Sequence, residues 1–143
     1  MPYRFQDEIT TADVAFEAWG DTREELFISC ATALLRTMTA APEQVAHEQK
    51  RVIRLKHEEL DLLLFSFLQE LIFHKDAHRL LLHADSVRIE QRESIFKLVA
   101  TVSGEPIDAA RHRLLVDVKA VTLHRFQVLF RDNQWRAVVE LDV

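Results

Sequence analysis

The chain has 143 residues, of which 48% are hydrophobic and 29% charged, and its net charge is −5 at pH 7. This length fits one domain, residues 1–143, which buries about two-thirds of its unfolded surface. An acidic chain without a run of lysines or arginines is not expected to bind nucleic acid stably by itself, and no apolar run approaches the ~18 residues of a membrane span.

The N-terminal part predicts a strand followed by a helix. Residues 14–19 alternate between the two faces of a strand, and Gly20 ends it. Thr22 and Glu25 form a capping box, in which each side chain satisfies a free backbone N–H at the helix start. The apolar stripe of this helix consists of Phe27, Cys30, Ala31, Leu34, Leu35 and Met38. We therefore read Cys30 as a core thiol, and one cysteine, which leaves no internal disulfide, indicates a cytoplasmic protein.

The middle of the chain predicts a strand over residues 51–56 and a second helix that starts near Glu58 and Glu59. The apolar residues of this helix cover so wide a surface that we expect it to pack on more than one side. Its end carries His74 and His78, whose spacing of four could hold zinc. Titrating side chains at a helix C-terminus more often meet the helix dipole, and we favour that reading.

Two hairpins follow. Residues 80–91 and 95–103 are β-rich runs around a turn, and Gly104 is expected to open a loop. A second pair of β-rich runs, 118–130 and 135–143, closes the chain. The pattern predicts an α+β fold in which two helices pack on a mixed or antiparallel sheet of six or seven strands, as one compact domain.

The last run places carboxylates in an unusual position. Glu140 and Asp142 fall on one face, and Asp142 adjoins the terminal carboxylate of Val143. Strands disfavour Asp, and neighbouring carboxylates repel each other, so a cation or basic side chains are needed to keep them ordered. We interpret the C-terminus as a working acidic tip, and Asp13, by itself a common turn residue, as a ligand only if other acids join it.

Lys119 and His124 are the other polar residues of interest near the tip. They are five positions apart, an odd number, so in an unbroken strand their side chains would face opposite ways. They can share a site only if the strand bulges or ends between them. Without further information, each is more often a solvated or turn residue.

The chain resembles the archease family in several pieces spread over its whole length and in the same order. These pieces are Met1 to Phe5, Thr11 to Phe27, Leu60 to Phe73, Gly104 to Pro106, Arg111 with His112, Val118 to His124, Trp135 to Ala137, and Leu141 to Val143. No piece is decisive alone, but their joint pattern is specific.

The resemblance implies an accessory protein, not an enzyme, that activates the RtcB-type RNA ligase of tRNA splicing and RNA repair. Such a protein promotes guanylylation of the ligase and its multiple turnover. The resemblance also implies a divalent-cation site formed by Asp13, Asp142 and Val143, so that acids from both ends of the chain converge. Oxygen ligands of this kind suit Ca²⁺ first, with Mg²⁺ or Mn²⁺ as alternatives. Lys119 and His124 become candidates for ligase activation.

One position departs from the family pattern. Archeases commonly have His before the Thr-Ala-Asp motif, whereas this chain has Thr10 there. A hydroxyl is a poorer metal ligand than an imidazole. We therefore assign the ligand role to Asp13 and none to Thr10.

Two other functions are compatible with the residues. A general chaperone would need an exposed apolar patch of several hundred Å² and would act on unrelated proteins. A metal-dependent phosphoester hydrolase would be built on Asp13, Asp142 and His124, although few general bases are at hand.

Overall fold

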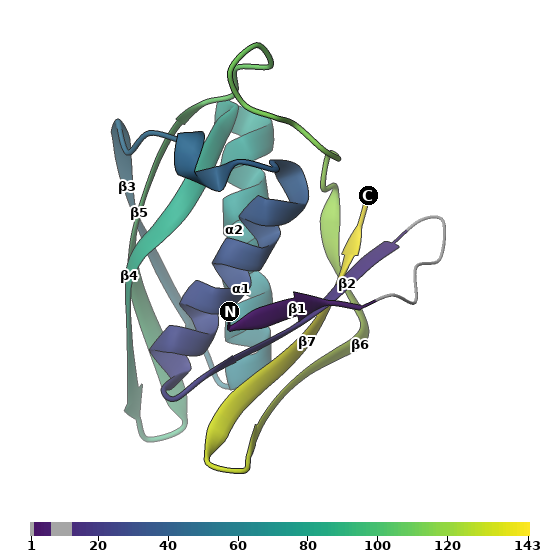
Figure 1. Ribbon diagram of the computed structural model, residues 1–143. Helices are drawn as coiled ribbons and strands as arrows, with labels where there is room; N and C mark the ends of the chain where they lie inside the picture. Colours follow the sequence, from purple (N-terminus) through teal and green to yellow (C-terminus); the bar gives the residue numbers. More distant parts are fainter. Residues whose placement is uncertain (1, 7–12) are drawn as a thin grey trace.

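The computed structural model describes residues 2–6 and 13–143, and Figure 1 shows their arrangement. The elements in chain order are β1 (Tyr3–Phe5), β2 (Asp13–Gly20), α1 (Arg23–Met38), the short 3₁₀ helix η1 (Pro42–Gln44), β3 (Gln49–His57), α2 (Leu60–His78), β4 (Leu80–Arg92), β5 (Ile95–Pro106), β6 (Ala120–Arg131) and β7 (Gln134–Asp142). Among these described helices, neither is long and apolar enough to cross a membrane.

The strands form two antiparallel sheets, and the helices lie between them (Figure 1). The four-stranded sheet has the order β1-β2-β7-β6, and the three-stranded sheet has the order β3-β5-β4. The α+β class with two helices is confirmed, but the expected continuous sheet is wrong. Its physical reason is the wide apolar surface of α2, on which Leu64, Phe67 and Leu68 are at most 1% exposed. A helix that is apolar on several sides needs cover on more than one.

The start of α1 and its buried stripe agree with the predictions. Thr22 Oγ1 accepts a hydrogen bond from the backbone N–H of Glu25 (3.1 Å). The Glu25 carboxylate accepts in return from the N–H of Asp21 (2.8 Å), one residue before the expected partner. Cys30 is fully buried, and burial raises the pKa of its thiol well above the ordinary value. Cys30 is therefore an unreactive core thiol.

Gly104 does not open a loop, as the sequence suggested, but lies inside β5 opposite Leu82. The neighbouring strand β4 comes so close that a Cβ at this position would lie 1.6 Å from the carbonyl oxygen of Leu81. Glycine is therefore required here by a close backbone approach between strands. Because no side chain interrupts the pairing, β5 continues to Pro106.

A buried polar group anchors the connection between β5 and β6, residues 107–119. Glu105 is 2% exposed and lies 2.6 Å from Nε2 of His112, which is 1% exposed. The N–H of Asp108 donates to Nδ1 of the same ring (2.9 Å), so the ring donates to Glu105 through Nε2. Arg111 also donates to the Glu105 carboxylate. These hydrogen bonds fix the conformation of the connection. After it, the chain continues through Val118 into the four-stranded sheet.

This arrangement predicts an acid-sensitive contribution to stability. The hydrogen bond from His112, with the contacts of Arg111, lowers the pKa of Glu105 from 4.5 to about 2, despite the opposing effect of burial. A depressed carboxyl pKa stabilises the fold fully above pH 4.5, and this contribution is lost as the pH falls toward 2. Glu105→Gln should lower the free energy of unfolding at pH 7 and flatten its fall between pH 4.5 and 2.

Urea unfolding of the wild type and the variant over this pH range measures the effect. Glu90→Gln, at an exposed position of β4, is the matched control and should keep the wild-type profile. A pH profile of Glu105→Gln parallel to that of the wild type would contradict the assignment.

Candidate functional site: an acidic cluster at one end of the four-stranded sheet

Asp13 and Asp142 are direct neighbours across two strands. β2 and β7 pair antiparallel from Asp13 opposite Asp142 to Gly20 opposite Trp135. Asp142 also lies opposite Ala120 on β6. The first residue of β2 and the last of β7 therefore meet at one end of the sheet, although 128 positions of chain lie between them. Their side chains share the sheet face turned away from the helices.

Glu140 is the centre of this group, and the sequence analysis did not assign it a role. It lies two residues before Asp142 on the same face and is 4% exposed. Its carboxyl group shares a hydrogen bond with Asp13, lies 3.2 Å from Nδ1 of His124 and accepts from Nε of Arg125 at 3.2 Å. We call Asp13, Glu140 and Asp142 the acidic cluster. The alternating pattern of this strand puts Glu140 on the same face as Asp142, and from this pattern Glu140 could have been predicted to belong to the site.

A large bulge in β6 brings His124 to the cluster. Thr122 lies opposite Glu140 and Gln127 opposite Val138, so four residues of β6 face one residue of β7. Within the bulge, Arg125 has φ of 57°, in the left-handed region. The condition under which Lys119 and His124 could share a site, a break in the strand, is therefore met.

Lys119 and Val143 frame the cluster from the backbone side. The N–H of Lys119, just before β6, donates to the carbonyl oxygen of Asp142 (2.8 Å), while the Lys119 side chain is exposed. Val143 is half-buried and packs against the hydrophobic core. The end of β7 is thus held by a hydrogen bond and by apolar contact.

The charges of the cluster are only partly balanced. The hydrogen bond with Glu140 raises the pKa of Asp13, as do burial and repulsion by Glu140 and Asp142, and His124 offsets this in part. Burial works to raise the pKa of Glu140, but hydrogen bonds from Asp13, His124 and Arg125 lower it overall. The pKa of Asp13 and the pKa of Glu140 therefore shift in opposite directions, which makes Asp13 the weaker acid of the pair.

The donor chemistry of the cluster fits a hard cation, since carboxylate oxygens are the ligands of Ca²⁺ and Mg²⁺. Within residues 2–6 and 13–143, however, no three His, Cys, Asp or Glu side chains are spaced to hold a metal ion. This also applies to His74 and His78, whose rings lie 5.4 Å apart at the end of α2. Asp13 and Glu140 instead adopt the geometry of a hydrogen-bonded acid pair. Thr10 lies outside the described residues.

The raised pKa of Asp13 gives a direct test of its pairing with Glu140. In Glu140→Gln, an amide replaces the charged partner, so both the repulsion and the carboxyl hydrogen bond that raise the pKa of Asp13 are lost. The pKa of Asp13, followed by NMR of its side-chain carboxyl carbon, should fall toward its ordinary value. Glu17→Gln, four residues further along β2, is the control and should leave the pKa of Asp13 unchanged. An unchanged pKa in Glu140→Gln would contradict the pairing.

Comparisons with known proteins match nearly the whole chain. Residues 3–143 match the family described as Archease protein family (MTH1598/TM1083). The archease of Pyrococcus abyssi is 32% identical over 134 residues, 93% of this chain and 94% of that protein. That of Methanothermobacter thermautotrophicus is 35% identical over 133 residues, with the same coverage.

Solved structures give the same result. The solution structure of protein 1598 of Methanobacterium thermoautotrophicum covers 99% of each chain with a TM-score of 0.85 and 32% identity. The crystal structure of a Thermotoga maritima protein, described as an archease and possible chaperone, covers 98% of each chain with a TM-score of 0.62 and 19% identity, which supports the fold alone. The resemblance of the sequence pieces is therefore confirmed, and this chain belongs to the archease family.

Proposed function

We propose that this archease is a non-catalytic activator of an RtcB-type RNA ligase, which promotes guanylylation of the ligase and so allows multiple turnover in tRNA splicing or RNA repair. The observation that carries the proposal is the direct cross-strand pairing of Asp13 with Asp142 next to the buried Glu140. An acidic group at the end of a sheet can enter the site of another protein, where bound nucleotide and metal are to be positioned.

The predicted cation site fits the same end of the sheet. Asp13 and Asp142 would hold the ion, with Val143 contributing a carboxylate or carbonyl oxygen, and Ca²⁺ is the first choice, followed by Mg²⁺ and Mn²⁺. A bound divalent cation would supply positive charge toward the phosphates of GTP. The contribution of the chain is to bring together carboxylates that would otherwise repel each other.

The neighbouring basic groups have distinct roles in this proposal. The exposed Lys119 side chain is free to neutralise phosphate at the rim of the cluster. His124 is held near Glu140 by the bulge of β6, so its ring is oriented before any partner binds. Glu140 is a positioning residue, because it acts through Asp13 and His124.

A general chaperone is the second candidate, and a specific observation favours it. Phe5, Leu115 and Val116 are 41%, 57% and 41% exposed, and together with Val14 they line a groove of about 270 Å³. The Thermotoga maritima protein is also described as a possible chaperone. Exposed apolar side chains of this kind can contact unfolded chains.

The decisive variant is Asp142→Ala, which removes one carboxylate and leaves the backbone pairing of β7 intact. In a single-turnover assay of GMP transfer from GTP to a cognate ligase, we expect this variant to stimulate the reaction about tenfold less than the wild type, or weaker still. Glu90→Ala removes the same charge from β4 on the other sheet and should stimulate like the wild type. Circular dichroism of both variants checks that the fold is retained.

The outcomes separate the candidate functions. Normal stimulation by Asp142→Ala, and by a chain extended beyond Val143, would overturn the activator proposal. Suppression of the aggregation of an unrelated protein, equal in the wild type and Asp142→Ala and lost in Leu115→Asp, would favour the chaperone.

A further inference from the structure

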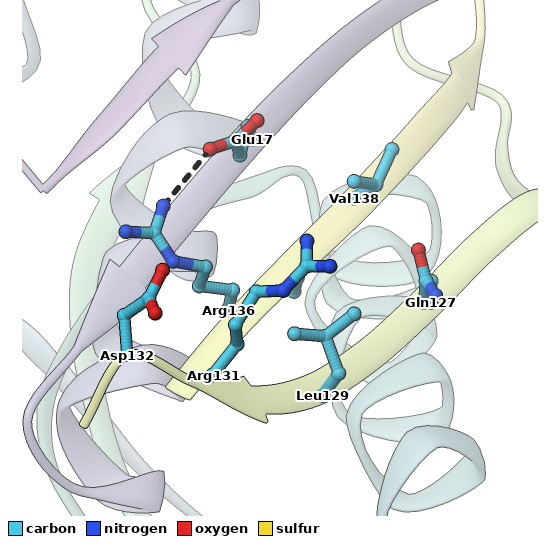
Figure 2. A pocket seen from close by; sticks show the side chains of 8 residues that line it. Glu17, Gln127, Leu129, Arg131, Asp132, Arg136 and Val138 are labelled. Carbon is cyan, nitrogen blue, oxygen red and sulfur yellow. Dashed lines mark hydrogen bonds and ion pairs between the residues drawn. The ribbon is translucent and has the colours of Figure 1, made fainter. Parts of the chain in front are cut away.

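The same face of the four-stranded sheet has a cavity at its other end, near the β6–β7 turn. Figure 2 shows this cavity, of about 340 Å³, from close by. We call it the arginine pocket, and it is lined by Glu17, Gln127, Leu129, Arg131, Asp132, Arg136, Ala137 and Val138. None of these residues belongs to the acidic cluster, and the proposed function does not use them.

The strand register explains the cavity. Glu17, Val138 and Gln127 form one row across β2, β7 and β6, and Arg136 pairs with Leu129 in the next row. Val138 is short, whereas the arginines are long, so a hollow forms above the middle strand. Asp132 and Asn133 both have positive φ, at 54° and 63°, which forms the tight turn that places Arg131 opposite Gln134.

Arg136 is held in place by its neighbours. Its Nη1 donates to Glu17 (3.3 Å), and its Nη2 donates to the side-chain oxygen of Gln134 (3.0 Å). Glu17 also accepts from Arg4 at 3.4 Å, so two guanidinium groups compensate one carboxylate. Arg136 thus presents a fixed positive charge at the wall of the pocket.

Arg131 is the group that lacks a partner. It is exposed and makes no ion pair or side-chain hydrogen bond with any residue that the structure describes. In Figure 2 its guanidinium is seen between Arg136 and Gln127, whereas Glu17 and Asp132 are seen on the side of Arg136. The lining has two arginines, 131 and 136, and two acids, 17 and 132, so its formal charges balance, in a chain whose net charge is −5. Outside the lining, Arg4 contributes a further positive charge through its hydrogen bond to Glu17.

We propose that the arginine pocket binds a phosphate group carried by a nucleotide or by an RNA strand. The planar guanidinium of Arg131 can donate two parallel hydrogen bonds to phosphate oxygens, and the amide of Gln127 supplies a further donor. The cavity exceeds the needs of a lone carboxylate and falls in the size range of small-molecule sites. Leu129 and Val138 provide apolar contact for a ribose.

The pocket and the acidic cluster form two ends of one face. Arg136 and Asp142 are six positions apart on β7, which corresponds to about 20 Å along an extended strand. A ligand in the pocket would therefore lie on the same face as the cluster without touching it. The inference does not rest on the proposed function, and a failure of either leaves the other standing.

The test is an NMR titration of the ¹⁵N-labelled full chain at low salt. Uridine 5′-monophosphate, a single-stranded oligouridylate and uridine are the ligands, because they share the base and differ in the phosphate. Both phosphate-bearing ligands should shift the side-chain signals of Arg131, Arg136 and Gln127, and uridine should not. Tighter binding of the monophosphate or of the oligonucleotide identifies the source of the phosphate, and either result supports the proposal.

Arg131→Ala should weaken this binding about tenfold, the value of one lost bidentate contact. Arg92→Ala removes the same charge from the turn end of β4 and should bind like the wild type. Equal affinity of Arg131→Ala and the wild type would overturn the proposal. Tighter binding of an oligoglutamate than of either phosphate ligand would also overturn it, since the pocket would then serve an acidic protein.

Discussion

The antiparallel pairing of β2 with β7 is the constraint on which the rest of the site depends. The inner face of this pair buries Phe16, Ala18, Val139 and Leu141, none of which is measurably exposed. A slip of one residue would turn these side chains toward solvent and their polar neighbours toward the core. The burial of apolar side chains therefore sets the register, and the register places carboxylates from both ends of the chain together.

Repulsion between the carboxyl groups of the acidic cluster destabilises the fold, and the burial of this apolar core offsets the repulsion. Three carboxyl groups meet at this end of the sheet, His124 and Arg125 contact Glu140, and the hydrogen bond with Glu140 and the remaining repulsion raise the pKa of Asp13. Like charges held close together are common at functional sites, because a ligand that relieves their repulsion binds favourably there. The bulge of β6 contributes to the same site, because β6 remains the edge strand of the sheet while two of its side chains point toward Glu140.

Local sequence patterns predicted much of the fold. Alternation indicated β2 and β7, and the capping box located the start of α1, because these signals depend on residues close in sequence. The division into two sheets and the position of Gly104 inside β5 were not predicted. Both depend on how strands that are distant in sequence approach one another. Gly104 was predicted to open a loop, but glycine is required there because the carbonyl oxygen of Leu81 leaves no room for a side chain.

The site was predicted unevenly for the same reason. Asp142 drew attention because Asp is unusual in a strand, whereas Asp13 gained a role only through the family resemblance. Glu140 was passed over, since a glutamate in an alternating strand is ordinarily solvated. Its burial depends on the bulge of β6, which nothing in residues 123–126 announces. The arginine pocket was not predicted because its residues come from three strands and a turn.

The central proposal is that Asp13, Asp142 and Val143 hold a divalent cation at the joined ends of β2 and β7. Paramagnetic broadening of the ¹H–¹⁵N spectrum by substoichiometric Mn²⁺ tests it most directly, because it locates the ion by distance. The account predicts that the amide signals of Asp13, Asp142 and Val143 broaden first and that Asp142→Asn abolishes this at the same Mn²⁺ concentration. Broadening centred on His74 and His78, or spread evenly over the surface, would contradict the account.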